Sequence, residues 1–141
     1  MIVLDTDHLS VLGYPANSHA VTLIARMEQS GEHDYATSIV TVEEQLRGWL
    51  SLISRLPDVH KQVTYYERLL TRLAFLGGWK VLPFDTHAAD EFKRLRRAKV
   101  RIGTMDLKIA SIALVHDALL LSGNLRDFRQ VPGLEVENWL G

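Results

Sequence analysis

The chain has 141 residues, 47% of them hydrophobic and 23% charged, and this composition predicts one domain, residues 1–141, with an ordinary hydrophobic core. Sixteen Lys and Arg against seventeen Asp and Glu leave a formal net charge of -1, which excludes a uniformly basic protein that coats nucleic acid. The lack of cysteine excludes disulfides and thiolate metal sites. The sequence has no apolar run of membrane-spanning length and no basic segment before its first apolar residues, so we expect a cytoplasmic protein without a membrane anchor.

Strand and helix signals alternate along the chain. Short apolar and β-branched runs predict four strands, at residues 2–4, 35–40, 79–84 and 118–121. Apolar positions that recur every three or four residues predict helical segments at residues 8–30, with a break near Gly13, and at 41–53, 58–76, 86–98 and 105–116. Strands that alternate with helices pair in parallel through right-handed crossovers. The sequence therefore predicts an α/β fold, a three-layer α/β/α sandwich with a mainly parallel sheet.

Polar residues follow the predicted strands or open the helices beside them, at the edge where an open parallel sheet binds ligands. They are Asp5, Asp7, Glu43, Glu44, Asp85, Asp106, Asn124 and Asp127. Carboxylates gathered there repel one another by about 4 kcal/mol per pair at about 4 Å for an effective dielectric constant of about 20. A divalent cation offsets that repulsion, and oxygen ligands suit Mg²⁺ or Mn²⁺, whereas the six histidines lack a zinc spacing. The set predicts hydrolysis of a phosphate ester or phosphodiester.

Four motifs occur in order along nearly the whole chain. They are Leu4-Asp5-Thr6-Asp7, Thr41-x-x-Glu44-x-x-x-Gly48, the segment from Asp106 to Ala113, and Ser122-x-Asn124-x-x-Asp127-Phe128, which leads to Asn138-Trp139. In these motifs the chain resembles PIN-domain ribonucleases, specifically the VapC-type toxins of bacterial toxin–antitoxin pairs. The resemblance implies an α/β/α sandwich whose acidic pocket binds Mg²⁺ or Mn²⁺ and cleaves RNA. It also implies a homodimer and a cognate antitoxin protein that blocks the pocket.

The resemblance assigns roles to individual residues. Asp5 and Asp106 match the two most dependable metal-binding aspartates of the family, and Glu44 matches its glutamate. Many members have an aspartate where this chain has Asn124, so Asn124 and Asp127, three residues later, are together expected to complete the catalytic set. Asp7 occupies a position where relatives often carry Asn, which suggests a supporting or water-holding role.

Two interpretations of the glutamate pair remain open. The Thr41-x-x-Glu44 spacing is formally a capping box, in which Glu44 reaches back to the helix start. Projected at 100° per residue, Glu43 borders the expected buried stripe, whereas Glu44 points away from it. The family spacing favours Glu44 as the ligand, and we follow the spacing. The expected stripe is Val42, Leu46, Trp49, Leu50 and Ile53.

A basic run follows the acidic residues Asp90 and Glu91. Its cations are Lys93, Arg94, Arg96, Arg97, Lys99 and Arg101. Such runs usually form a solvated helix face, but beside an acidic pocket they also suit RNA phosphates. Both interpretations stay open for Arg94, Arg96, Arg97, Lys99 and Arg101.

Other polar and apolar positions have simpler expected roles. His8 lies near Asp5 and is expected to be a surface or capping residue rather than a proton-transfer group. The apolar positions of the 58–76 helix, Val63, Tyr66, Leu69, Leu70 and Leu73, are expected in the core, although an exposed part would suit a dimer interface.

Two other functions compete with the nuclease. The Asp5-x-Asp7 pair directly after the first strand also matches the nucleophile and acid of haloacid-dehalogenase-like phosphatases, but Leu9 occupies the place of that family's Thr or Val. Asn124 in place of the usual acid favours a non-catalytic module that binds RNA or protein.

Overall fold

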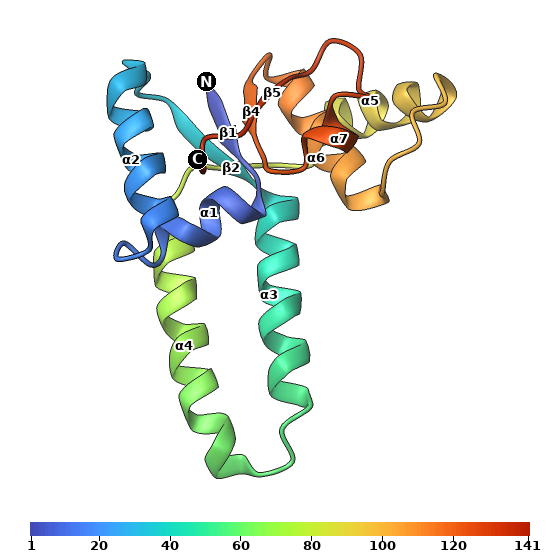
Figure 1. Cartoon of the computed structure of the whole chain (residues 1–141). Helices are drawn as coiled ribbons and strands as arrows, with labels where there is room; N and C mark the ends of the chain where they lie inside the picture. The colour runs from blue at the N-terminus through green and yellow to red at the C-terminus, as the bar shows by residue number, and fades with distance from the viewer.

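The computed structural model describes all residues, 1–141, and contains one five-stranded sheet in the order β3-β2-β1-β4-β5 (Figure 1). All four strand pairs are parallel, as predicted. The strands are β1 (Ile2–Leu4), β2 (Tyr35–Ser38), β3 (Val81–Leu82), β4 (Leu119–Leu121) and β5 (Glu135–Glu137). The sequence did not predict β5, whose two glutamates give it no apolar run.

Helices connect the strands in the predicted alternation. They are α1 (Thr6–Leu12), α2 (Ser18–Ser30), α3 (Ile39–Ser54), α4 (Val59–Gly77), α5 (Thr86–Arg97), α6 (Thr104–Val115) and α7 (Leu125–Phe128). The short α7 was not predicted, and α3 begins at Ile39, two residues before the predicted start, because Ser38 is its N-cap and accepts a hydrogen bond from the Thr41 amide (3.0 Å). No helix is long and apolar enough to cross a membrane.

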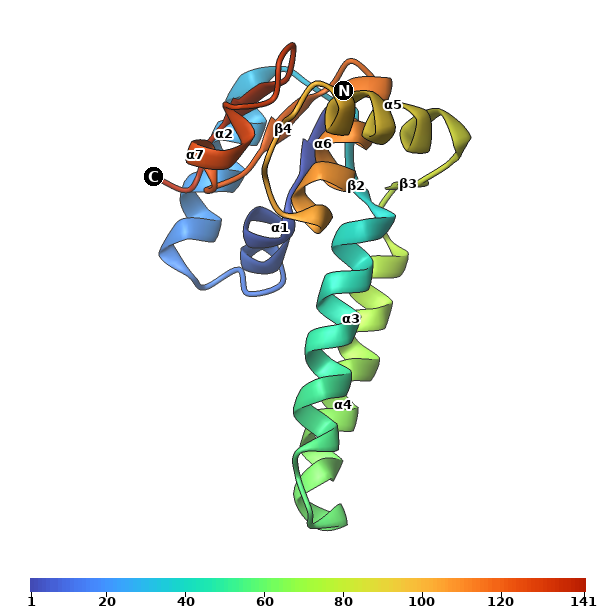
Figure 2. The ribbon, with the colours of Figure 1, turned by 90° about the vertical axis from the view of Figure 1, so that its right-hand side faces the viewer.

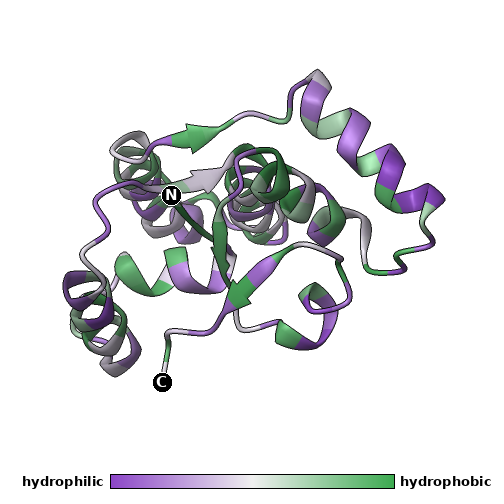
Figure 3. Cartoon of the chain, turned by 90° about the horizontal axis from the view of Figure 1, so that it is seen from above, coloured by the Kyte–Doolittle hydropathy of each residue, from purple (hydrophilic) through white to green (hydrophobic).

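The central strand β1 separates two hydrophobic cores. Because side chains alternate along a strand, Val3 faces the core under α5 and α6, whereas Ile2 and Leu4 face the core under α1 and α2. Helix α6 is apolar on nearly every side and is buried between the sheet and α5. Seen from above, the hydrophobic strands lie at the centre with helices on both sides, and the largely hydrophilic α5 lies at the periphery (Figure 3). The three-layer α/β/α sandwich is confirmed.

Helices α3 and α4 pack on each other and project from the body of the molecule as a long hairpin (Figures 1 and 2). The prediction that the α4 stripe is core was wrong for four of its positions: Val63, Tyr66, Leu70 and Leu73 are exposed, Leu70 by 71%. In the α3 stripe Leu50 is likewise 58% exposed, although Ile53 is buried. Periodicity identified the apolar faces, but the projecting hairpin has no third layer to cover them.

Candidate active site

Asp5 lies at the carboxyl end of β1, where it is the N-cap of α1. Its backbone amide donates to the Leu121 carbonyl (2.9 Å), and its Oδ1 accepts from the Thr6 amide (2.7 Å). Its Oδ2 accepts from the Ser122 hydroxyl (2.7 Å), which in turn accepts from the Asn124 amide (3.0 Å). The Asp5 side chain is therefore fixed between the ends of β1 and β4, and only 7% of the residue is exposed.

The structure separates the two neighbouring glutamates. Oε2 of Glu44 accepts from the Thr6 hydroxyl (2.9 Å), which holds Glu44 beside the Asp5 turn. Glu43 instead pairs with Arg47 one helical turn later. The capping-box interpretation of Thr41 and Glu44 was wrong, because Thr41 lies inside the helix and Ser38 caps it. Glu44, and not Glu43, borders the buried face of α3 that includes Thr41 and Gln45, and it contacts Thr6 of α1.

Asn124 joins the remaining two carboxylates. Its Nδ2 donates to Oδ2 of Asp106 (3.0 Å) and to Oδ2 of Asp127 (3.1 Å). Asp106 lies in the first turn of α6, whose N-cap is Gly103, so its carboxylate caps nothing. Asp85, the remaining strand-end carboxylate, is the N-cap of α5 and accepts from the Ala88 amide (3.0 Å). It has no hydrogen bond to the other acids.

Asp7 and His8 form a second layer behind these residues. Oδ2 of Asp7 accepts from the Gly123 amide (2.7 Å), and Oδ1 contacts the ring Nδ1 of His8 (2.7 Å). Nε2 of His8 accepts from the backbone amide of Trp139 (3.0 Å), so the ring proton lies on Nδ1. His8 is fully buried, and the expectation of a surface or capping histidine was wrong.

The acidic cluster lacks basic partners. Asp5, Glu44, Asp106 and Asp127 form no ion pair with Lys or Arg. Burial raises the pKa of Asp5, and the charges of Asp7 and Asp106 raise it further against the hydrogen bonds from Ser122 and Thr6. Burial likewise raises the pKa of Glu44, aided by the charges of Asp5 and Glu43.

The pKa of Asp106 is also raised, by burial first and then by the charges of Glu44, Asp127 and Asp7. Burial alone would raise the pKa of Asp7 too, but hydrogen bonds from His8 and the Gly123 amide outweigh it and lower that pKa. The pKa values of Asp5, Glu44 and Asp106 are thus raised because burial and neighbouring negative charges dominate, whereas the pKa of Asp7 is lowered because its hydrogen bonds dominate.

The donor set suits a hard cation. It consists of carboxylate and amide oxygens with no thiol, and its mutual repulsion is what a bound divalent ion offsets. No group of three or more acidic or histidine side chains is already drawn together in the spacing of a metal site. Each acid is instead held by a neutral donor: the Thr6 hydroxyl binds Glu44, the Ser122 hydroxyl binds Asp5, and the Asn124 amide binds Asp106. Sequence reasoning gave these two hydroxyls no role, although Ser122 directly follows β4 and Thr6 comes two residues after the end of β1.

These raised pKa values predict a pH effect on stability. At neutral pH the ionised Asp5 lowers the free energy of unfolding, and the penalty disappears as the pH falls through its raised pKa toward about 4, the ordinary carboxyl range. We therefore expect Asp5→Asn to be more stable than the unaltered protein at pH 7 without metal, with the gap closing by about pH 4. Urea unfolding across this range measures it; a gap independent of pH would contradict the effect.

The basic run lies on α5 and the loop after it, and its cations are exposed. Arg94 pairs with Glu91, and Arg96 donates to the Thr104 hydroxyl (3.0 Å) with its guanidinium 5.1 Å from the Phe92 ring centroid. Thr104 begins the helix that carries Asp106. The run therefore flanks the acidic cluster on its α6 side.

An acidic cluster at the carboxyl edge of a parallel α/β/α sheet defines the class of this protein. The family model for the PIN domain matches residues 2–134. The chain belongs to the PIN domain family, and the haloacid-dehalogenase-like alternative is therefore set aside.

Curated relatives carry ribonuclease names. The tRNA(fMet)-specific endonuclease VapC of Salmonella typhimurium is 28% identical over 94 residues, covering 64% of this chain and 71% of the relative. Ribonuclease VapC2 of Rickettsia felis is 32% identical over 69 residues, covering 46% of this chain and about half (52%) of the relative.

Solved structures match nearly the whole chain. FitAcB from Neisseria gonorrhoeae superposes with a TM-score of 0.69 at 27% identity, covering 98% of this chain and 97% of that one. VapBC2 from Rickettsia felis bound to a promoter DNA fragment superposes with a TM-score of 0.68 at 21% identity, covering 99% of both chains. The second likeness supports the fold alone.

Proposed function

We propose that this protein is a divalent-metal-dependent endoribonuclease that hydrolyses RNA phosphodiester bonds as the toxin of a toxin–antitoxin system. The observation that carries the proposal is the convergence of Asp5, Glu44 and Asp106 at one sheet edge without any basic partner. The ribonuclease names of the relatives support RNA as the substrate class.

Asp5, Asp106 and Glu44 are the residues that would hold Mg²⁺ or Mn²⁺. When bound, such an ion makes water a stronger nucleophile and offsets the charge of a phosphodiester. Oε2 of Glu44 is held by the Thr6 hydroxyl, which leaves Oε1 to accept a proton from the attacking water. Asn124 and Asp127 complete the site: Asn124 fixes the carboxylate of Asp106, and Asp127 accepts a hydrogen bond from the same amide nitrogen of Asn124.

The direct test is cleavage of mixed cellular RNA by the purified protein with Mg²⁺ or Mn²⁺ and with EDTA. We expect discrete fragments that require the metal and are absent with the Asp5→Asn variant, which also excludes a contaminating nuclease. RNA binding without cleavage, unchanged by EDTA, would favour the non-catalytic module instead.

The proposal includes an antitoxin protein as partner. Structural neighbours include FitAcB and VapBC complexes, which cover nearly the whole of this chain, and a VapBC-5 complex described as a member of a toxin–antitoxin family. When this chain is purified from its source cell, we expect the antitoxin to co-purify with it. Removing that protein should increase metal-dependent RNA cleavage by this chain. Unchanged cleavage after its removal would contradict an inhibitory partner.

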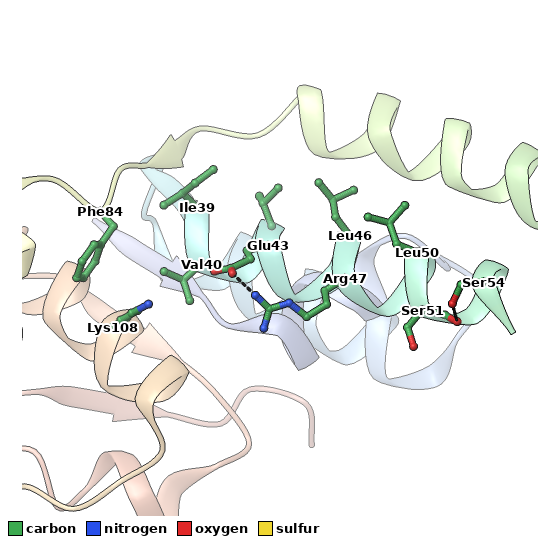
Figure 4. Close-up of a pocket in the computed structure, with 11 residues that line it drawn as sticks. Ile39, Val40, Glu43, Leu46, Arg47, Leu50, Ser51, Ser54, Phe84 and Lys108 are labelled. Carbon is green, nitrogen blue, oxygen red and sulfur yellow. Dashed lines mark hydrogen bonds and ion pairs between the residues drawn. The ribbon is translucent and has the colours of Figure 1, made fainter.

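The proposal also includes a homodimer formed through the projecting hairpin. A groove of about 920 Å³ runs along α3, and Ile39, Leu46 and Leu50 project from one side of it while Glu43 pairs with Arg47 (Figure 4). Helix α4, which packs on α3, also carries exposed apolar residues, and a second copy would cover the apolar surface of the hairpin. Sedimentation equilibrium should give twice the chain mass, and Leu50→Glu with Leu70→Glu should return it to the monomer value.

A further inference from the structure

A cavity leads away from the acidic cluster toward the hairpin. It has a volume of about 340 Å³, begins at Thr6 and Glu44, and continues to Trp49 and Arg72. A wider hollow of about 790 Å³ between α1, α3 and α4 shares Tyr14, Trp49 and Arg72 with it. The two hollows therefore adjoin at these three residues, the smaller one includes the proposed catalytic glutamate, and both lie in the size range of small-molecule sites.

Arg72 is a buried cation without a counter-charge. Only 8% of the residue is exposed, it forms no ion pair, and its one hydrogen bond is a long contact from Nη2 to the Ser10 carbonyl (3.4 Å). Its guanidinium carbon lies 4.9 Å from the ring centroid of Phe75 and 5.8 Å from that of Tyr14. Burial lowers its pKa. A cation held this way retains donors for an incoming anion.

Gly13 makes room for this guanidinium. A Cβ atom at Gly13 would lie 2.2 Å from Nη1 of Arg72, closer than atoms can approach, although the backbone there has an ordinary φ of -75°. The position of the guanidinium thus depends on a missing side chain, and any larger residue at position 13 would displace it.

The cavity wall also holds an unsatisfied polar atom. Oε1 of Gln45 is buried and has no hydrogen-bond partner, while its Nε2 donates to the Ser10 hydroxyl (3.3 Å). If the amide is turned over, the nitrogen becomes the unpartnered atom instead. In either orientation one buried polar atom of Gln45, which lines the same cavity as Arg72, lacks a hydrogen-bond partner.

We propose that this cavity binds the nucleotide next to the scissile phosphate, with the Arg72 guanidinium on a backbone phosphate and the base against Trp49 and Tyr14. Arginine matches phosphate with two parallel hydrogen bonds, and aromatic faces accept any base by stacking. Gln45 supplies the polar contact to the base or ribose. This inference rests on the proposed ribonuclease function, and it gives RNA a second contact surface, built from α1, α3 and α4, apart from the basic run of α5.

Binding of a fluorescent single-stranded RNA pool in EDTA, where cleavage is blocked, tests the site. We expect Arg72→Gln to weaken binding by about tenfold or more and to reduce the slope of log affinity against log salt by about 0.7, the loss of one phosphate contact. Arg72→Lys keeps the charge but loses the planar fork, so its affinity should lie in between. Arg55→Gln is the matched control: Arg55 is exposed at the end of α3 and lines neither hollow, so this variant should leave the slope unchanged.

Gly13→Ala is a second variant that tests the same site without changing any charge. It should displace the guanidinium and weaken binding as Arg72→Gln does, which keeps the test valid if Arg72→Gln fails to fold. Unchanged affinity and slope in both variants, with metal-dependent RNA cleavage intact, would overturn the inference and leave the proposed function standing. If an oligoglutamate of matched length binds as tightly as RNA and its binding also depends on Arg72, the inference is overturned, and the ligand of Arg72 is a carboxylate of a partner protein. An unaltered protein that neither binds nor cleaves RNA would overturn both proposals.

Discussion

Asp106→Asn is expected to abolish metal-dependent RNA cleavage without unfolding the protein. Loss of even an outer partner of a metal ligand costs about 10- to 100-fold, so loss of a direct carboxylate should exceed about a hundredfold. The amide oxygen of the new side chain still accepts from Nδ2 of Asn124, which preserves the local hydrogen bond. Cleavage of cellular RNA at saturating Mn²⁺ measures the effect.

Thermal unfolding separates the loss of metal from the loss of structure. A cation that binds only the folded protein raises the melting temperature, and we expect millimolar Mn²⁺ to do so in the unaltered protein but less in Asp106→Asn. Without metal the variant should melt at the same temperature or slightly higher, because the repulsion from Glu44 and Asp127 is removed.

Asp85→Asn is the matched control for this experiment. Asp85 also follows a strand, but it caps α5 and lies outside the acidic cluster, and asparagine caps helices equally well. It should leave both cleavage and the Mn²⁺ response unchanged. An equal response to Mn²⁺ in Asp106→Asn would remove Asp106 from the metal site.

His8→Ala is expected to cost about 3 kcal/mol of the free energy of unfolding, within the range for opening a buried cavity and leaving polar groups unpaired. The ring is fully buried and joins Asp7 of α1 to the amide of Trp139 at the far end of the chain. Alanine would leave that amide without an acceptor and Asp7 without its strongest hydrogen bond. Urea unfolding followed by circular dichroism gives the difference.

His19→Ala is the control for this second variant. His19 also holds the C-terminal segment, through Nδ1 and the Leu140 carbonyl (2.8 Å), but it is exposed. Its loss should cost less than about 1 kcal/mol, because water replaces the contact. Equal losses of unfolding free energy in the two variants would show that the buried ring of His8 contributes no more to stability than the exposed hydrogen bond of His19.

The sequence predicted a cluster of acidic residues at one edge of the sheet because the ends of the strands can be recognised in the sequence. The apolar runs of β1 and β4 end at Asp5 and at Ser122, and because the two strands are parallel, their carboxyl ends lie together at one edge of the sheet. The choice between Glu43 and Glu44 depended on which face of α3 is buried. Helical projection favoured Glu43 because it took the stripe through Leu46 and Leu50 as buried, whereas the buried face runs through Thr41 and Gln45, beside Glu44.

Other features have no local signal. The apolar faces of α3 and α4 were visible as a periodicity, but periodicity does not say what covers a face, and Leu70 is exposed. Arg72 is one cation in a long helix, and its burial depends on Gly13, which is 59 positions away. Both depend on how distant segments meet, which no window of sequence contains.

The connection between Asp5 and Ser122 has a consequence for synthesis on the ribosome. Asp5 emerges early, but the hydroxyl that fixes it lies 117 residues later, and Asp106, Asn124 and Asp127 also belong to the last third of the chain. At about 5 to 20 residues per second, translation of that span takes about 6 to 23 seconds. A nascent chain therefore carries no assembled acidic edge, and the messenger RNA being translated is exposed to a completed site only after β4 has joined β1.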